Sequence, residues 1–198
     1  MSTAPTRRLS PQEYLAQERL ADFRSEYLRE EVFAMAGASF EHTIIKDNFA
    51  GEIRNLLKNG PCRVLTSDQR VKVDLSGLYT YPDITIVCDE PQFEDAVFDT
   101  LLNPRVIVEV LSDSTEKYDR GAKFGHYRQL PSLQEYVLVA QDRPLVERYV
   151  RQANGSWSVT YFDQLSQVFA FAFIPAQIPL TEIYRGIKFT ETPPVKPQ

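Results

Sequence analysis

The chain has 198 residues, a length that fits a single domain. Hydrophobic residues make up 43% and charged residues 25% of the composition, as in ordinary soluble globular proteins, and 10 Tyr with 12 Phe allow a sizeable core. The formal net charge of −5 excludes a broadly basic surface for nucleic acid. Any contact with phosphate must therefore come from a local basic patch or from a bridging metal ion.

Cys62 and Cys88 are the only cysteines, and no CxxC or His/Cys cluster surrounds them, which excludes a structural zinc site. Two isolated cysteines favour a reducing compartment. The first ten residues contain no apolar core, so we expect no secretory signal. The longest apolar stretch, residues 168–174, is far shorter than the ~20 residues that cross a bilayer. We therefore expect a cytoplasmic protein without a membrane partner.

Two helices and a hairpin are predicted in the first third of the chain. Ser10-Pro11-Gln12-Glu13 is a capping box with Pro at the first helical position, and it predicts a helix over residues 11–20. Residues 25–28 and 31–35 resemble two strands around Arg29-Glu30, although this turn lacks the Gly or Asn that short hairpins prefer. A second helix is expected from the N-cap Ser39 to Gly60. Its apolar face consists of His42, Ile45, Phe49, Ile53 and Leu56.

Strands dominate the rest of the chain, with one helix in the middle and a short one near the end. The predicted strands are residues 62–65, 70–73, 83–88, 105–111, 136–140, 145–150 and 157–162, and the predicted helices are 119–129 and 180–184. An acidic loop, residues 89–99, separates two of the strands. Three prolines after residue 191 predict a disordered tail over 191–198, which leaves one domain over 1–190.

Glu109 is the anomaly that carries information about function. It lies inside the run Val106-Ile107-Val108-Glu109-Val110-Leu111, which is apolar enough for a central strand covered on both faces. An ionised carboxylate buried there is costly unless a cation compensates for it. A structural salt bridge is one explanation, and a bound metal ion is the other.

Asp83 follows a proline and begins an apolar strand 26 residues before Glu109. Two adjacent strands that each offer one carboxylate at an end can hold a hard divalent cation, and Mg²⁺ accepts one or two carboxylates together with water and phosphate oxygens. A Pro-Asp pair alone is more often a simple turn. The pairing with Glu109 favours a metal site.

Lys123 is the third candidate, because phosphodiester hydrolysis needs a cation close to the charge that develops on phosphorus. It lies on the helix that follows the Glu109 strand, three residues after Arg120 and four before Tyr127, so the three share a helical face. The competing interpretation is a solvated lysine on an ordinary amphipathic helix.

These positions resemble a known sequence motif. Pro82-Asp83 followed by Glu109-Val110-Leu111 is similar to the PD-(D/E)xK motif of the restriction-endonuclease superfamily, with Leu111 in place of the usual lysine. That departure resembles the Uma-two family of endonucleases, formerly a domain of unknown function. The matching run is Val108-Glu109-Val110-Leu111-Ser112, Ser114-Thr115, Tyr118-Asp119-Arg120-Gly121, Lys123 and Tyr127. Further matches, among them Glu31, Ala36-Gly37-Ala38-Ser39 and His42, extend the resemblance over residues 11–157.

The resemblance implies an α/β (α+β) fold with a restriction-endonuclease-like core, in which helices flank a central mixed β-sheet and an N-terminal helix and hairpin are added. It implies Asp83 and Glu109 as metal ligands for Mg²⁺, with Mn²⁺ as a substitute, and the Val110 carbonyl as a further ligand. It also implies that Lys123 replaces the motif lysine and that Glu31 is a supporting acid. The implied activity is metal-dependent endonuclease cleavage of DNA.

Several alternatives stay open. Lys72, on a neighbouring predicted strand, rivals Lys123 as the catalytic lysine. His42 can orient a phosphate or a carboxylate, or be a satisfied core residue. Arg120 and Tyr127 can bind the substrate, and Arg120 can instead pair with Asp83 or Glu109.

The net charge and the acidic loop are also compatible with a catalytically inactive nuclease fold that serves as a binding or assembly module. A homodimer or higher homo-oligomer is expected for an active enzyme, because a double-strand break needs two active sites. Phe169, Phe171 and Phe173 alternate with alanine, so they form either an interface or a core strand.

Overall fold

The computed structural model describes residues 8–35 and 37–189, so the tail predicted to be disordered lies outside the described residues. In chain order the elements are α1 (Pro11–Glu18), β1 (Ser25–Leu28), β2 (Glu31–Ala34), α2 (Phe40–Leu57), β3 (Arg63–Thr66), β4 (Arg70–Val73), β5 (Leu78–Thr80), β6 (Ile84–Val87), β7 (Thr100–Leu101), β8 (Val106–Leu111), α3 (Glu116–Tyr118), η1 (Asp119–Lys123), α4 (Phe124–Tyr127), β9 (Glu135–Ala140), β10 (Val146–Arg151), β11 (Trp157–Phe162), β12 (Val168–Ala170), β13 (Gln177–Pro179) and α5 (Leu180–Ile183). The predicted strands and helices are all present, with small shifts at their ends.

A six-stranded mixed sheet forms the centre of the molecule, in the order β11-β10-β9-β8-β6-β3. Its one parallel pair is β8 with β9, and the neighbouring pairs are antiparallel. A smaller sheet, β2-β1-β5-β4-β7, carries the N-terminal hairpin at its edge. The expected central mixed sheet with an added helix and hairpin is therefore confirmed.

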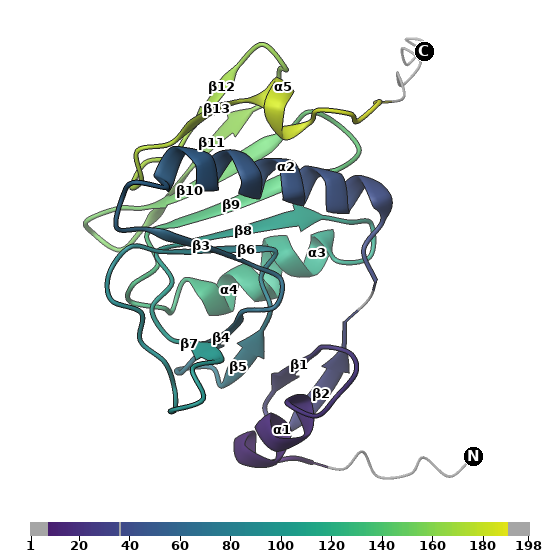
Figure 1. Cartoon of the computed structure of the whole chain (residues 1–198), viewed down its shortest axis with the longest axis vertical. Coiled ribbons are helices and arrows are strands. Elements are labelled where there is room, and N and C mark those ends of the chain that lie inside the picture. The colour runs from purple at the N-terminus through teal and green to yellow at the C-terminus, as the bar shows by residue number, and fades with distance from the viewer. Residues whose placement is uncertain (1–7, 36, 190–198) are drawn as a thin grey trace.

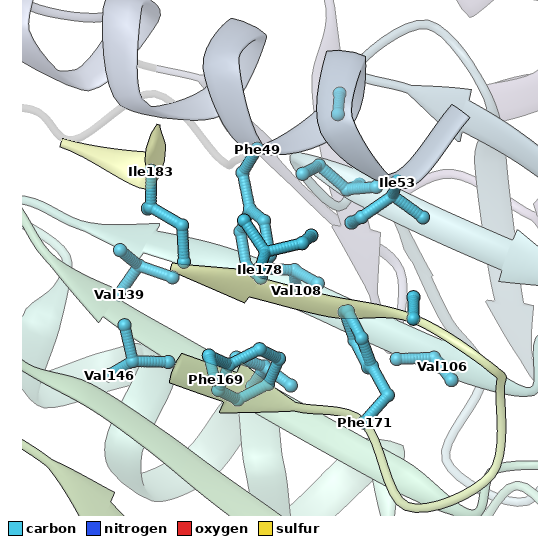
Figure 2. Close-up of a cluster of buried hydrophobic side chains, with 14 of the residues drawn as sticks. Phe49, Ile53, Val106, Val108, Val139, Val146, Phe169, Phe171, Ile178 and Ile183 are labelled. Carbon is cyan, nitrogen blue, oxygen red and sulfur yellow. The ribbon is translucent and has the colours of Figure 1, made fainter. Parts of the chain in front are cut away.

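The two faces of the central sheet are covered by different elements (Figure 1). Helix α2 lies over one face, and Phe49 and Ile53 belong to a cluster with Val106 and Val108 of β8 and with Phe169 of β12 (Figure 2). The short helices α3 and α4 lie on the other face, where Tyr127 packs in a second cluster that includes Ile107 and Leu111. The central sheet therefore has helices on both faces.

Alternation along β8 decides where Glu109 points. Val106, Val108 and Val110 pack in the cluster on the α2 side, whereas Ile107 and Leu111 pack in the opposite cluster. Successive side chains of a strand point to opposite faces. Glu109 therefore shares the face of Ile107 and Leu111, the face that α3, η1 and α4 cover.

The N-terminal elements follow their predicted signals. Ser10 and Glu13 form both hydrogen bonds of the capping box, and the Ser39 side chain accepts the His42 N–H at the start of α2. Arg29 and Glu30 have φ values of 49° and 72°, so the hairpin makes its tight turn with left-handed residues other than glycine. In α2 the apolar face ends on Leu57, which is buried, whereas the predicted Leu56 is exposed.

Three expectations about the remaining segments need correction or completion. Cys62 and Cys88 are not isolated: they form a disulfide, because β3 and β6 pair antiparallel and bring the flanking cysteines together. The disulfide therefore removes the argument for a reducing compartment, which rested on isolated cysteines.

Phe169 and Phe171 are core residues beneath α2. Among the described residues, no helix is both long and apolar enough to cross a membrane.

The helix predicted over residues 119–129 begins earlier and is not uniform. It consists of α3, a π-helical turn η1 and then α4, and the chain leaves the helix after Tyr127. A π-turn inserted between α-helical segments commonly marks a functional position. Both Arg120 and Lys123 lie on this turn.

Candidate active site

A cleft of about 870 Å³ opens where the N-terminal hairpin, the start of α2, and the adjacent ends of β6 and β8 meet. Phe33, Ala34 and Met35 of the hairpin segment line one wall, and residues 112–115 after β8 line another. Several charged side chains also face the cleft. They are Glu26, His42, Lys46, Asp83, Glu109, Asp113, Asp119 and Lys123.

Asp83 and Glu109 are held against each other by the main chain. The antiparallel register pairs Ile84 with Val108, so the next position places Asp83 opposite Glu109. The Asp83 N–H donates to Glu109 Oε2 at 3.2 Å, and the Val110 N–H donates to Asp83 Oδ2 at 2.8 Å. Each carboxylate is thus fixed by a backbone amide next to the other one.

Glu109 is buried, with only 3% of its surface exposed, and it has two further partners. The Tyr127 hydroxyl donates to Oε1 at 2.8 Å, and Lys123 Nζ lies 3.0 Å from the same oxygen. Burial raises the pKa of Glu109 to about 8. The charges of Asp119 and Asp83 also raise this pKa, whereas the charge of Lys123 lowers it. In the metal-free protein, this carboxylate therefore ionises with difficulty.

Lys123 is surrounded by acids. Besides Glu109, its Nζ lies 3.4 Å from Glu26 Oε1 and 3.4 Å from Asp119 Oδ1. Burial alone would lower the pKa of Lys123, but the three carboxylates outweigh it and hold that pKa well above its ordinary value. The charged form of this cleft-lining lysine is therefore favoured.

The balance of charge around Lys123 is strongly negative. Glu26, Asp83, Glu109 and Asp119 line the cleft against one buried lysine, and burial raises the pKa of Asp119 as well. Within the described part of the chain, no three His, Cys, Asp or Glu side chains form a group that could hold a metal ion. A cation here would therefore rest on the Asp83–Glu109 pair, with water, phosphate or a backbone carbonyl completing its shell.

His42 reaches the pair from α2, on the other side of the cleft. Its Nε2 lies 2.9 Å from Asp83 Oδ1, and its side chain is 13% exposed. The helix begins at Phe40, after the N-cap Ser39, so His42 is in the first turn, and its partner Asp83 directly precedes β6. Of the two interpretations left open for this residue, the geometry favours one in which it orients a carboxylate.

Other predicted site residues lie elsewhere. Glu31 is exposed on β2 and does not line the cleft, so the expectation of a supporting acid at that position is not met. Arg120 pairs with Glu116 and Glu147 and turns away from the cleft. Tyr127 is fully buried behind Glu109, which corrects its expected role in binding substrate.

Lys72, the rival lysine, lies outside the cleft. Its Nζ is 2.8 Å from both Glu94 and Asp74, and neither of these acids lines the cleft. Val110 lines the cleft, and its N–H donates to Asp83, while a role of its carbonyl as a metal ligand stays a prediction.

Two acids were missed from the sequence. Glu26 lies on β1, opposite Phe33 of β2, and also accepts hydrogen bonds from the Thr80 and Tyr118 hydroxyls. Asp119 lies four residues before Lys123, a spacing that would have paired the two on a helix. Strand alternation alone could not show which of Glu26 and Glu31 turns inward.

Known proteins resemble the chain over most of its length. The model of the Uma2 family, described as "Putative restriction endonuclease", matches residues 11–181. An uncharacterized protein of Synechocystis sp. is 34% identical over 187 residues, which cover 94% of this chain and 97% of the relative. A second one from the same organism is 35% identical over 160 residues, with 81% and 90% covered.

A solved structure has the same fold. The crystal structure of "a putative nuclease belonging to DUF820" from Anabaena variabilis matches with a TM-score of 0.72 and 17% identity. The match covers 89% of this chain and 97% of that one. At this level of identity the likeness establishes the architecture.

Proposed function

Since the chain belongs to the Uma2 family, described as "Putative restriction endonuclease", we propose that it is a Mg²⁺-dependent endonuclease that hydrolyses DNA phosphodiester bonds. The observation that carries this proposal is the Asp83–Glu109 pair, which two backbone amides hold at the mouth of a cleft beside a buried lysine. Such a pair is the motif expected at the ends of two adjacent strands in a PD-(D/E)xK site.

The donor set suits a hard divalent cation. Asp83 and Glu109 would hold it, and the excess of carboxylates around Lys123 is the charge that such an ion would neutralise. Mg²⁺ prefers one or two carboxylates with water and phosphate oxygens, and Mn²⁺ is a natural substitute. When bound, the cation supplies Lewis-acid polarisation of the scissile phosphate.

The protein's own side chains would orient the two carboxylates and neutralise negative charge on the phosphate. Lys123 Nζ, 3.0 Å from Glu109, is a fixed positive charge for the oxygens of the phosphate as negative charge develops on them. His42 holds Asp83 Oδ1, and the Tyr127 hydroxyl holds Glu109 Oε1. These hydrogen bonds fix the orientation of both carboxylates before substrate arrives, which lowers the reorganisation needed in the reaction.

Plasmid cleavage tests the proposal. The wild-type protein should nick or linearise supercoiled plasmid in Mg²⁺ or Mn²⁺ but not in EDTA, whereas Asp83→Asn and Lys123→Met should each lose at least about 100-fold of the rate. Lys72→Met is the matched control, because it removes the rival lysine while leaving the cleft untouched. It should cut within about threefold of wild type.

Two outcomes would contradict the proposal. Persistent cutting by both Asp83→Asn and Lys123→Met would point to a contaminating nuclease. A wild-type protein that neither cuts DNA nor binds Mn²⁺ would favour the alternative, an inactive nuclease fold used for binding or assembly. Because a double-strand break needs two sites, we also propose that the active species is a homodimer, and its mass in solution by light scattering tests this.

A further inference from the structure

The cleft by itself offers little attraction for a polyanion. Its acids outnumber its cations, and the whole chain carries a net charge of −5. Affinity for DNA comes largely from contacts between cationic side chains and phosphates. A substrate longer than the cleft therefore needs basic residues beside it, and one side of the cleft has them.

The first of these residues is Lys46, one turn after His42 on α2. It lines the cleft, and its Nζ lies 3.2 Å from the Ser67 hydroxyl at the end of β3. Asp47 is 3.7 Å from that Nζ but is itself 65% exposed, so it forms a weak surface pair. Lys46, whose side chain is 18% exposed, therefore lines the cleft without a strong ion pair.

Arg54 continues the row along the same helix. Its guanidinium lies 3.3 Å from the Thr66 hydroxyl, and Thr66 precedes Ser67, so Lys46 and Arg54 contact consecutive residues at the end of β3 and just after it. Helix α2 and β3 contact each other. Strand β3 is also an edge strand of the central sheet.

Lys58 and Arg63 extend the row beyond Arg54. These three residues line a second pocket of about 400 Å³, which has no acidic residue in its lining. Arg63 donates to main-chain carbonyls, and Lys58 to the Asn55 side chain. Among the described residues, no carboxylate lies within ion-pair distance of Arg54, Lys58 or Arg63, whereas Arg19, Arg70 and Lys72 are all paired.

We propose that Lys46, Arg54, Lys58 and Arg63, here called the basic row, bind the phosphate backbone of duplex DNA that extends from the cleft. This inference rests on the proposed nuclease function and names the surface that its substrate would occupy. At 1.5 Å per residue, Arg54 and Lys58 lie about 12 and 18 Å along α2 from Lys46. A strand carries one phosphate per 3.4 Å of axis, so the row spans about five base pairs.

Salt-dependent binding tests the basic row separately from catalysis. The full chain in EDTA is titrated with a fluorescent 30-base-pair duplex, and the dissociation constant is measured by anisotropy at several salt concentrations. Arg54→Gln with Lys58→Gln should weaken binding and lower the slope of log Kd against log salt by about 2, one per lost phosphate contact. Lys46→Gln should lower it by about 1.

Arg128→Glu is the matched control, because it changes the formal charge by the same two units. Arg128 lies at the end of α4, on the face of the sheet opposite α2 (Figure 1). An unchanged slope in the double variant, a slope lowered as much by Arg128→Glu, or no binding by wild-type protein at low salt would each overturn the inference. Plasmid cutting by the wild-type protein in Mg²⁺, together with a normal thermal melt of the double variant, would show that such a result leaves the proposed nuclease function intact.

Discussion

Two clusters of charged residues in this molecule differ in how their charges balance. The first, here called the cleft cluster, places one cation, Lys123, against Glu26, Glu109 and Asp119, with Asp83 beside them. The second cluster, here called the ionic network, joins α1, β4 and the acidic loop. Its ion pairs are Arg19 with Asp95 and Asp99, Arg70 with Asp99, and Lys72 with Glu94 and Asp74.

The difference distinguishes a structural network from a candidate site. In the ionic network, hydrogen bonds from Arg19 hold the pKa of Asp99 well below its usual range, so its charge is favoured in the fold. In the cleft cluster, burial raises the pKa of Glu109 and of Asp119, so their charges are disfavoured. Buried acids with raised pKa values in a cleft are typical of functional sites, whereas paired acids with lowered pKa values are typical of structural ion pairs.

The largest expected effect is the difference in stability between variants of Lys123 and of Lys72. Lys123→Met leaves three buried or half-buried acids without their cation, so it should lower the free energy of unfolding at pH 7 by about 3 kcal/mol. Lys72→Met removes a more exposed pair and should cost about 1 kcal/mol. Urea unfolding in EDTA measures both. Equal losses would show that the clusters do not differ as described.

Divalent cations should stabilise one cluster only. A metal ion that binds the folded chain at ten times its dissociation constant adds about 1.4 kcal/mol to the free energy of unfolding. Mg²⁺ or Mn²⁺ should therefore raise the melting temperature of wild type and of Lys72→Met by a few degrees. The same ions should leave the melting temperature of Asp83→Asn unchanged. A similar rise in that variant would place the metal elsewhere.

The smallest expected effect is on the pH dependence of the free energy of unfolding, and its sign differs between the two clusters. Because its folded-state pKa is lowered, Asp99 stabilises the fold above its unfolded pKa of about 3.9, and this contribution disappears as the pH falls through the lower folded value. Asp99→Asn should therefore lose about 1 kcal/mol at pH 7.

Asp119 has a raised pKa, so its contribution to stability is present below about pH 3.9 and is lost as the pH rises through the folded value. Asp119→Asn should be neutral or stabilising at pH 7 in EDTA, and its unfolding free energy should vary less with pH than that of wild type. Urea unfolding at pH 5 and pH 7 compares the two variants. A destabilisation by Asp119→Asn equal to that of Asp99→Asn would contradict the assignment.

Much of the fold followed from local patterns. The capping box at Ser10, the N-cap at Ser39 and the apolar run around Glu109 each predicted an element that the structure contains. What local patterns could not show is pairing between distant strands. The Cys62–Cys88 disulfide depends on the register of β3 with β6, and the small sheet includes the two-residue strand β7, which is too short to predict.

The site was predicted where a residue conflicted with its surroundings and missed where it did not. Glu109 stood out because it interrupts an apolar strand, and Asp83 and Lys123 followed from it. Glu26 did not stand out, because an acid in a half-exposed hairpin strand is unremarkable, and the face it takes depends on tertiary contact. Arg120 pairs with Glu116 and with Glu147 of β10 instead of Asp83 or Glu109, and the contact with β10 depends on the tertiary fold, which local sequence does not show.

The π-turn η1 makes the position of Lys123 relative to Asp119 depend on chain length as well as on residue type. Lys123 ends η1 four residues after Asp119, and its Nζ contacts both Asp119 and Glu109. Deleting Ala122 would place Lys123 three residues after Asp119 instead of four, a difference of about 100° around a regular α-helix. Every chemical group would still be encoded, yet the ammonium could no longer contact the two carboxylates in the same way.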